Sequence, residues 1–308
     1  LIFDIYENCA YELLMELQQK YGRDIPVTVL IGSIRDKKRL DEVFETYHPT
    51  VVFHAAAHKH VPLMEVSPAE AVKNNVLGTK NLLVSASEHD VERFVQLSTD
   101  KAVNPTSVMG CTKRICEMLI QTFAGNTDMK CVAVRFGNVL GSHGSVIPLF
   151  EAQIKKGGPV TLTDPNIERY FMTIPEAAQL VLQAGALAES GNIYVLDMGE
   201  PVKIMDLAKQ LIRFYGYEPG VNMEIKIVGL RPGEKLYEEL MMDEEQGKMR
   251  RTEHNKIFVA SPRDIDLAVF YQQLQDLAAA AQHNDEGVVD QLEKMIPTFT
   301  PTRKNLKV

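Results

Sequence analysis

Short apolar runs alternate with amphipathic segments through the first half of the chain. Five runs predict short buried strands, at Leu1–Asp4, Val27–Ile31, Val51–His54, Phe94–Ser98 and Cys131–Arg135. Helical patterns lie between them, at Asn8–Lys20 (with Leu13, Leu14 and Leu17 on one face), Lys37–Thr46, Pro68–Glu88 and Met109–Ala124. This alternation predicts an α/β fold with a doubly wound parallel sheet covered on both faces. Ligands of such sheets bind beyond the carboxyl ends of the strands, so functional residues should follow the strands directly.

The pattern becomes irregular from about Gly144. Short strands and turns such as Gly157-Gly158-Pro159 predict a smaller C-terminal α/β lobe that is interleaved with the first domain. The last stretch, Asp264–Val308, predicts two helices and a Pro-containing tail. We therefore expect three parts: 1–143 as a truncated dinucleotide-binding domain, 144–262 as mainly a substrate lobe, and 263–308 as C-terminal helices.

Composition narrows the class of protein. Apolar residues make up 45% of the 308 residues and charged residues 24%, which is typical of a globular domain. A formal net charge of -8 argues against nucleic acid as a main partner. The four cysteines form no CxxC pair, which favours a cytoplasmic location, and no apolar run reaches the ~18 residues of a membrane span. The chain begins at Leu1, inside a predicted strand, which suggests a fragment.

Two polar segments carry candidate chemistry. Ser98-Thr99-Asp100-Lys101 directly follows a predicted strand and offers a proton donor beside a proton acceptor, although an ordinary turn with an exposed ion pair would have the same residues. Farther on, Met109 and Lys113 lie four residues apart at the start of a helix and therefore share one face. Taken alone, Met109 is better explained as a core residue at the start of the helix.

Together these segments resemble a specific family. The stretch STDKAVNPTSVMGCTKRICE is similar to the bacterial UDP-N-acetylglucosamine 4,6-dehydratases of polysaccharide biosynthesis, which are extended short-chain dehydrogenases/reductases. The motifs HAAAHKHVPLMEVSPAEAVKNNVLGT, RFGNVLGSHGSVIPLF, ERYFMTIPEA and RPGEKLYEEL extend the resemblance to about Pro262. The wider family has a Tyr-xxx-Lys pair, and methionine in place of the tyrosine is a mark of this branch. The resemblance thus identifies Met109 and Lys113 as the matching pair.

The resemblance implies NAD as the cofactor. The family opens with a strand and a GxxGxxG turn that holds the pyrophosphate, and this chain has no such turn before Leu1. Asp4 matches the acid on the adenosine ribose, Asp36 the adenine contact, and Ala55 and Ala56 a stretch along the cofactor. Asn75 matches a residue that fixes the active-site backbone, and Lys113 one that holds the nicotinamide ribose. Either aspartate could instead be a helix cap.

The resemblance also implies a UDP-sugar substrate and a homo-oligomer. Lys59, His60 and Asn138 fall beside the substrate, while Arg169 and Arg231 match positions for the diphosphate, although single arginines often form surface salt bridges instead. The run from Gly137 to Gly144 mimics a dinucleotide turn, but its spacing is GxxxGxxG and it matches a substrate-side loop. His54, His58 and His60 lack a completing ligand, so no metal is expected.

A redox-neutral loss of water needs a base at O4, a base at C5 and an acid at the C6 hydroxyl. A thioether cannot accept a proton near neutral pH, so Met109 cannot be the O4 base. We expect Asp100 to take the O4 proton with Thr99 relaying it, and later to protonate the leaving hydroxyl. Lys101 is the expected C5 base, which requires a depressed pKa.

Three alternatives remain open from the sequence. A C5-inverting 4,6-dehydratase would need the same residues, whereas a 4-epimerase would need no acid at C6. A non-catalytic fragment is the third, favoured by the missing glycine turn. The stretch from Met249 to Val259 resembles longer, membrane-anchored members of the family, which would place this domain on the cytoplasmic face of a membrane.

Overall fold

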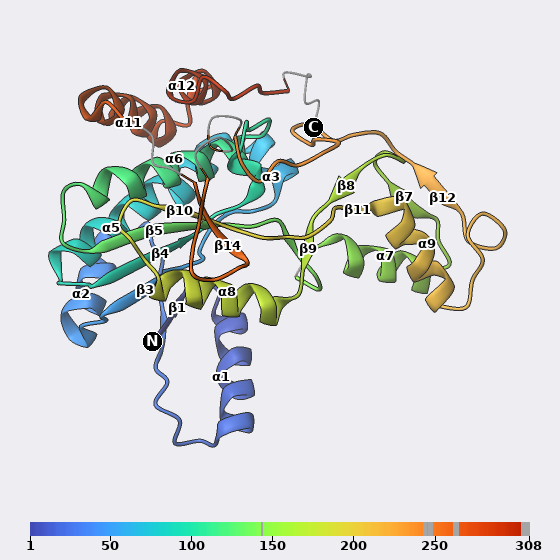
Figure 1. Ribbon diagram of the computed structural model, residues 1–308, viewed down its shortest axis with the longest axis horizontal. Coiled ribbons are helices and arrows are strands. Elements are labelled where there is room, and N and C mark those ends of the chain that lie inside the picture. The colour runs from blue at the N-terminus through green and yellow to red at the C-terminus, as the bar shows by residue number, and fades with distance from the viewer. Residues whose placement is uncertain (143, 243–244, 246–248, 261–264, 303–308) are drawn as a thin grey trace.

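Six strands form the main sheet of the computed structural model, which describes residues 1–142, 144–242, 245, 249–260 and 265–302 (Figure 1). Their spatial order is β13-β14-β10-β5-β4-β3. Strands β3, β4, β5 and β10 are parallel, while β14 and β13 are antiparallel to their neighbours. The bounds are β3 Val51–His54, β4 Arg93–Leu97, β5 Lys130–Arg135, β10 Ile193–Leu196, β13 Arg250–Arg251 and β14 Ile257–Ala260. The predicted α/β fold with a predominantly parallel sheet is confirmed.

Alternate residues of the central strands face opposite layers of helices. Phe94 of β4 belongs to the core on one side, whereas its neighbour Val95 belongs to the core on the other. Strand β5 alternates in the same way, with Ala133 and Val134 on opposite faces. The first face is covered by α2, α5 and α6 with α11 and α12, and the second by α8 (Figure 1). These helices are α2 Lys37–Tyr47, α5 Gly78–Glu88, α6 Val108–Ala124, α8 Ile174–Ala186, α11 Leu267–Gln282 and α12 Val288–Met295.

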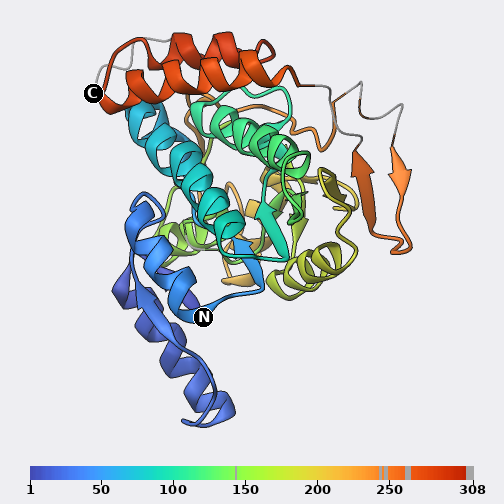
Figure 2. The same ribbon diagram turned by 90° about the vertical axis from the view of Figure 1, so that its left-hand side faces the viewer.

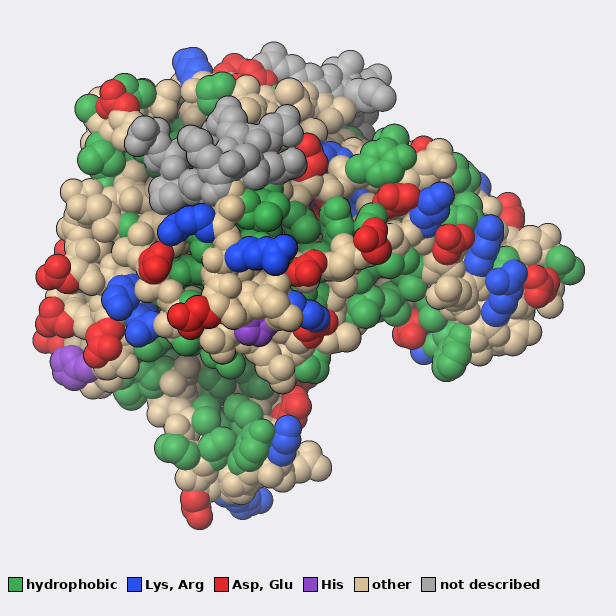
Figure 3. Space-filling view, viewed as in Figure 1, with side chains coloured by type: hydrophobic (Ala, Val, Ile, Leu, Met, Phe, Trp, Pro, Cys, Tyr) green, Lys and Arg blue, Asp and Glu red, His purple; other side chains and the backbone are tan. Residues whose placement is uncertain are grey.

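Strands β1 (Ile2–Asp4) and β2 (Val29–Ile31) form a separate parallel pair, joined by the helix α1 (Glu7–Tyr21) that projects from the body (Figures 1 and 2). The expectation that the early strands are buried is wrong for β3 and for this pair. Val51 is 40% exposed and Phe53 45%, and Leu13 on the expected apolar face of α1 is also exposed. Among the described residues no strand pairs with the outer edge of β3, so that edge stays open. Figure 3 shows hydrophobic side chains over the α1 projection.

Many of the residues after β5 form a smaller lobe beside the main sheet (Figure 1). Phe150 and Ile154 of one helix pack on Ala208 and Ile212 of another in a separate core. The elements are α7 Val146–Lys155, α9 Ile204–Phe214, the paired strands β7 Val160–Leu162 and β12 Ile225–Ile227, and the paired strands β8 Glu168–Arg169 and β11 Val202–Lys203. The chain returns to the main sheet through β10 and β14.

Several connecting elements complete the description. The expected helix at 68–88 is continuous but contains one wider turn, with bounds α4 Pro68–Ala71, η1 Val72–Leu77 and α5. Smaller elements are α3 Val61–Val66, η2 Asp100–Ala102, β6 Asn138–Val139 and β9 Phe171–Met172. The expected boundaries at 143 and 262–263, and the tail beyond 302, lie outside the described residues. Within the described part of the chain, no helix is long and apolar enough to cross a membrane.

Candidate active site

A cavity of about 510 Å³ lies where the carboxyl ends of β3, β4 and β5 face the smaller lobe. Its lining joins residues from three strand ends with residues of α6, α7 and the segment after Gly229. Among the residues that the sequence singled out, the lining contains Ala55, Lys59, His60, Thr99, Lys101, Met109, Lys113, Asn138, Arg169 and Arg231. The fold thus brings most of the predicted catalytic and substrate residues to one place.

The polar turn after β4 forms a tight cluster rather than an exposed ion pair. Asp100 is fully buried, and its Oδ1 accepts hydrogen bonds from Thr99 Oγ1 at 2.8 Å and from Lys101 Nζ at 2.9 Å. Lys101 Nζ also donates to Asn138 Oδ1 at 3.3 Å. Gly137 leaves room beside the other carboxylate oxygen, since a Cβ there would lie 3.3 Å from Asp100 Oδ2. The cluster therefore holds a hydroxyl, a carboxyl group and an amine within hydrogen-bond distance.

The charge state of Lys101 differs from the expectation. Burial works to lower the pKa of Lys101, but the carboxylates of Asp100 and Glu238 outweigh it, and the pKa is raised above its ordinary value. The prediction of a depressed pKa is wrong for this arrangement, because two acids flank the amine. In this state Lys101 is an ammonium group.

Helix α6 brings Met109 and Lys113 to the same cavity. Ser107 caps the helix by accepting a hydrogen bond from the amide of Gly110 at 3.1 Å. Gly110 is required here, because a side-chain carbon would collide with the carbonyl oxygen of Lys101. Met109 is buried, and burial lowers the pKa of Lys113. The packing of α6 therefore sets the position of the turn that carries Lys101.

A buried ion network anchors the ends of β4 and β5 beneath the cluster. Glu117 of α6 accepts hydrogen bonds from Ser98 Oγ at 2.7 Å and from Arg135 Nη2 at 2.8 Å. Arg114 and Glu245 complete the network. Although burial acts to raise it, the guanidinium groups of Arg135 and Arg114 hold the pKa of Glu117 at about 2. Ser98 directly precedes Thr99, so the network fixes the backbone of the turn that carries Thr99, Asp100 and Lys101.

The expected cofactor residues lie in two groups. Ala55 lines the cavity, and Ala56 follows it in the loop after β3. Asn75 pins that loop, since its Oδ1 accepts from the His58 amide at 2.7 Å and its Nδ2 donates to the His58 carbonyl at 3.1 Å. Asp4 and Asp36 are both exposed. Asp4 ends β1, whereas Asp36 precedes α2 and caps it by accepting a hydrogen bond from the Arg39 amide.

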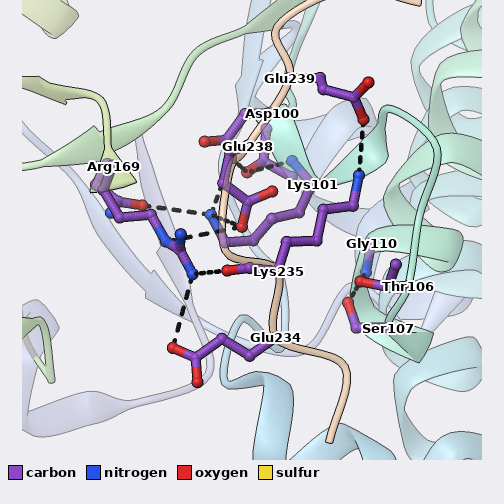
Figure 4. Close-up of polar contacts among 12 residues, drawn as sticks. Asp100, Lys101, Thr106, Ser107, Gly110, Arg169, Glu234, Lys235, Glu238 and Glu239 are labelled. Carbon is purple, nitrogen blue, oxygen red and sulfur yellow. Dashed lines mark hydrogen bonds and ion pairs between the residues drawn. The ribbon is translucent and has the colours of Figure 1, made fainter. Parts of the chain in front are cut away.

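The two arginines differ in their surroundings. Arg169 is buried, and its guanidinium donates to the carbonyl oxygens of Glu168, Lys235 and Leu236 (Figure 4). It therefore holds the 235–238 segment over the cavity, and its contact with a diphosphate stays a prediction. Arg231 is exposed at the cavity wall, and within the described residues no carboxylate pairs with its guanidinium. Arg231 has the freer donors for an anionic group.

Glu238 belongs to the site but was missed by the sequence analysis. Its side chain lines the cavity, with Oε1 3.5 Å from Lys101 Nζ and 3.8 Å from Arg169 Nε (Figure 4). The only signal was an acidic pair late in the RPGEKLYEEL motif, where Arg231 alone drew attention.

Residues 1–262 match the model of a family described as polysaccharide biosynthesis protein. The chain belongs to this family. Over 236 residues it is 58% identical to the capsular polysaccharide biosynthesis protein CapD of Staphylococcus aureus, covering 76% of this chain and 39% of CapD. It is 35% identical over 286 residues to a UDP-glucose 4-epimerase of Rickettsia canadensis, covering 90% of this chain and 82% of the relative.

A solved structure agrees with the family. The X-ray structure of Pen from Bacillus thuringiensis superposes with a TM-score of 0.77 at 35% identity, covering 84% of this chain and 79% of Pen. The chain spans well under half the length of CapD.

The sequence also raised a histidine cluster and a glycine-rich run as candidate sites. His54 is buried and its Nε2 lies 2.8 Å from Thr79 Oγ1, and burial lowers its pKa to about 3. Within the described ranges no group of three potential ligands is placed to hold a metal ion. Gly137 and Gly144 line the cavity, and the run between them connects β5 to α7.

Proposed function

We propose that this protein is an NAD-dependent 4,6-dehydratase of a UDP-N-acetylhexosamine, with UDP-N-acetylglucosamine as its substrate. The product would be a 4-keto-6-deoxy nucleotide sugar for surface polysaccharide or glycan synthesis. One observation carries the proposal: Thr99, Asp100 and Lys101 form a hydrogen-bonded donor and acceptor cluster at the wall of a cavity large enough for a sugar. Membership of the polysaccharide biosynthesis family supports it.

The residues fit NAD on the side of the cavity formed by β3 and α6. Ala55 and Ala57 are small lining residues at a strand's carboxyl end, where a flat cofactor can approach the backbone. Lys113 is buried beside them and can donate to ribose hydroxyls. Its positive charge would favour the neutral nicotinamide ring of NADH over the cationic ring of NAD+. Asp4 at the end of β1 and Asp36 at the start of α2 can accept hydrogen bonds from the adenosine end of the cofactor. NAD, when bound, supplies the hydride acceptor for C4 and the hydride donor for C6.

The side chains of the cluster divide the proton transfers. Thr99 already donates to Asp100, so a substrate hydroxyl at O4 can pass its proton through Thr99 to that carboxylate. The amine of Lys101 takes the C5 proton, which the 4-ketone has made acidic. Asp100 then returns its proton to the C6 hydroxyl, which leaves as water. Met109 contributes packing but no proton transfer.

A simple 4-epimerase is the second candidate, because a relative that is 35% identical has that name. Epimerisation removes and returns a hydride at C4 and needs a base only at O4. The site has both Asp100 and Lys101, which is more than the single base that epimerisation needs. The cluster therefore favours dehydration.

Mass spectrometry of UDP-N-acetylglucosamine incubated with NAD+ and the natural full-length protein tests the proposal. A product lighter by one water is the expected result, and NMR of that product would then show whether C5 is retained or inverted. A product of unchanged mass with inverted C4 would favour the epimerase. Unchanged substrate, with NAD bound, would contradict both.

A further inference from the structure

Lys101 lies between two acids that come from distant parts of the chain. Asp100 Oδ1 is 2.9 Å from Nζ, and Glu238 Oε1 is 3.5 Å from the same atom (Figure 4). The Lys101 side chain is 23% exposed toward the cavity, whereas that of Glu238 is 4% exposed. A C5 base must be a neutral amine, so the raised pKa of Lys101 leaves a gap in the proposed mechanism. The ammonium proton needs an acceptor within reach.

Glu238 has the properties of such an acceptor. Among the described residues, Oε2 of Glu238 and Oδ2 of Asp100 are buried without a hydrogen-bond partner. A buried carboxylate oxygen without a hydrogen-bond partner makes the anion more costly, and protonation of the group relieves that cost. Burial and the charge of Asp100 raise the pKa of Glu238, against the opposing charges of Lys101, Arg169 and Lys235.

We propose that Glu238 is a positioning residue that acts through Lys101, taking the ammonium proton of Lys101 before the C5 proton is removed and returning it at the end of turnover. This inference rests on the proposed dehydration. It assigns a role to Glu238, which lies opposite the strand ends and contacts Arg169.

The protons balance through one cycle. At the start Lys101 is an ammonium ion, and Asp100 and Glu238 are carboxylates. The O4 proton moves to Asp100, and the Lys101 proton then moves to Glu238. The neutral amine takes the C5 proton, and Asp100 gives its proton to the leaving C6 hydroxyl. Lys101 returns a proton to C5 as hydride reaches C6, and Glu238 then reprotonates Lys101.

The first step triggers the second. Protonation of Asp100 removes the negative charge 2.9 Å from Nζ, which is one of the two charges that raise the pKa of Lys101. Asp100 contacts Nζ directly and influences Glu238 through charge, so the loss lowers the pKa of the amine more than that of Glu238. The proton is therefore released toward Glu238 only after O4 has been deprotonated.

A kinetic comparison of three variants in the natural full-length protein tests this role. Glu238→Gln keeps the shape but cannot accept the proton, and it should lower kcat about tenfold to a hundredfold at neutral pH while KM changes little. Enzyme-bound NADH should accumulate, because the C4 oxidation still proceeds. Activity should recover as pH rises and solvent deprotonates Lys101. Glu238→Asp should restore part of the rate.

The matched control is Glu239→Gln. Glu239 neighbours Glu238 in sequence but is 45% exposed and pairs with Lys235 at 3.0 Å outside the cavity lining. Its replacement should leave kcat and the pH profile unchanged. A Glu238→Gln variant with wild-type kcat and pH profile would overturn the proposal. The proposal would also be overturned if the variant neither bound substrate nor formed NADH, because that result indicates a purely structural residue.

Carbon-13 NMR of the Glu238 carboxyl group, without substrate, gives an independent reading. Its titration midpoint should lie above that of an ordinary glutamate, fall in Asp100→Asn and rise in Lys101→Met. An ordinary midpoint that responds to neither variant would overturn the proton exchange. If the wild type forms no dehydrated product but these shifts occur, the proposed function and the exchange during turnover both fail, and only the charge coupling between Glu238 and Lys101 stands.

Discussion

Replacing Glu117 with glutamine removes one buried negative charge from the network that holds the ends of β4 and β5. Glu117 accepts hydrogen bonds from Ser98 Oγ at 2.7 Å, from Arg135 Nε at 3.0 Å and Nη2 at 2.8 Å, and from Arg114 Nη1 at 2.7 Å. The glutamine keeps the size of the side chain but leaves two buried guanidinium groups with less negative charge. The catalytic turn that begins at Thr99 would lose its anchor at Ser98.

The shifted pKa of Glu117 sets the magnitude. The shift from 4.5 to about 2 corresponds to about 3 kcal/mol of stability at neutral pH. Breaking a buried ion pair by removing one partner typically costs about 3–5 kcal/mol, which agrees. Because the folded pKa is depressed, this stability is present above the unfolded value of 4.5 and is lost as pH falls through about 2. At a pH of about 3.5 roughly 1 kcal/mol of it should already be gone.

Urea unfolding of wild type and Glu117→Gln, at neutral pH and again in acid, measures both effects. We expect the variant to be less stable by about 3 kcal/mol at neutral pH, with a smaller gap in acid. Glu176→Gln is the matched control, because Glu176 pairs with Lys256 at the exposed surface and should cost no more than about 0.5 kcal/mol. A neutral-pH loss below about 1 kcal/mol, or a gap that does not change with pH, would refute the reasoning.

Three further variants probe the site. Lys101→Met should abolish dehydration while isothermal titration still detects UDP-sugar binding; near-normal turnover would contradict its role as the C5 base. Gly110→Ala should lower kcat about tenfold or more, because the new methyl group displaces the Lys101 carbonyl; an unchanged kcat would show that the turn tolerates the shift. Arg231→Ala should raise KM about tenfold or more with a smaller change in kcat, as expected for a phosphate contact, whereas Arg213→Ala, an exposed pair with Glu218, should leave KM unchanged.

Much of the fold could be predicted from the sequence, because the strand and helix periods are local. Val51–His54 was predicted with its observed bounds, and the other early strands within one or two residues. Burial was predicted less well. Val51 and Phe53 have the apolar composition of a covered strand, but their exposure depends on whether another strand lies beside β3. Pairing of that kind is a property of distant segments, which a local pattern does not contain.

The site shows the same division. Thr99, Asp100 and Lys101 are adjacent in sequence, and their position after a strand together with the family resemblance marked them as candidates. Glu238 joins them from far along the chain, through the backbone contacts of Arg169 with the 235–236 segment. The sequence analysis therefore missed the second acid and predicted the wrong direction for the pKa of Lys101. Charge states in a buried cluster depend on every neighbour, including those brought in by the fold.

Dehydration by transfer of one hydrogen within the same sugar is the central claim. Its most direct test is to incubate UDP-N-acetylglucosamine carrying deuterium at C4 with the natural full-length protein and NAD+, and to locate the label by NMR. The account predicts a product that has lost water and carries the deuterium at C6. Deuterium that stays at C4 in a sugar of unchanged mass, or that is lost to solvent, would contradict it.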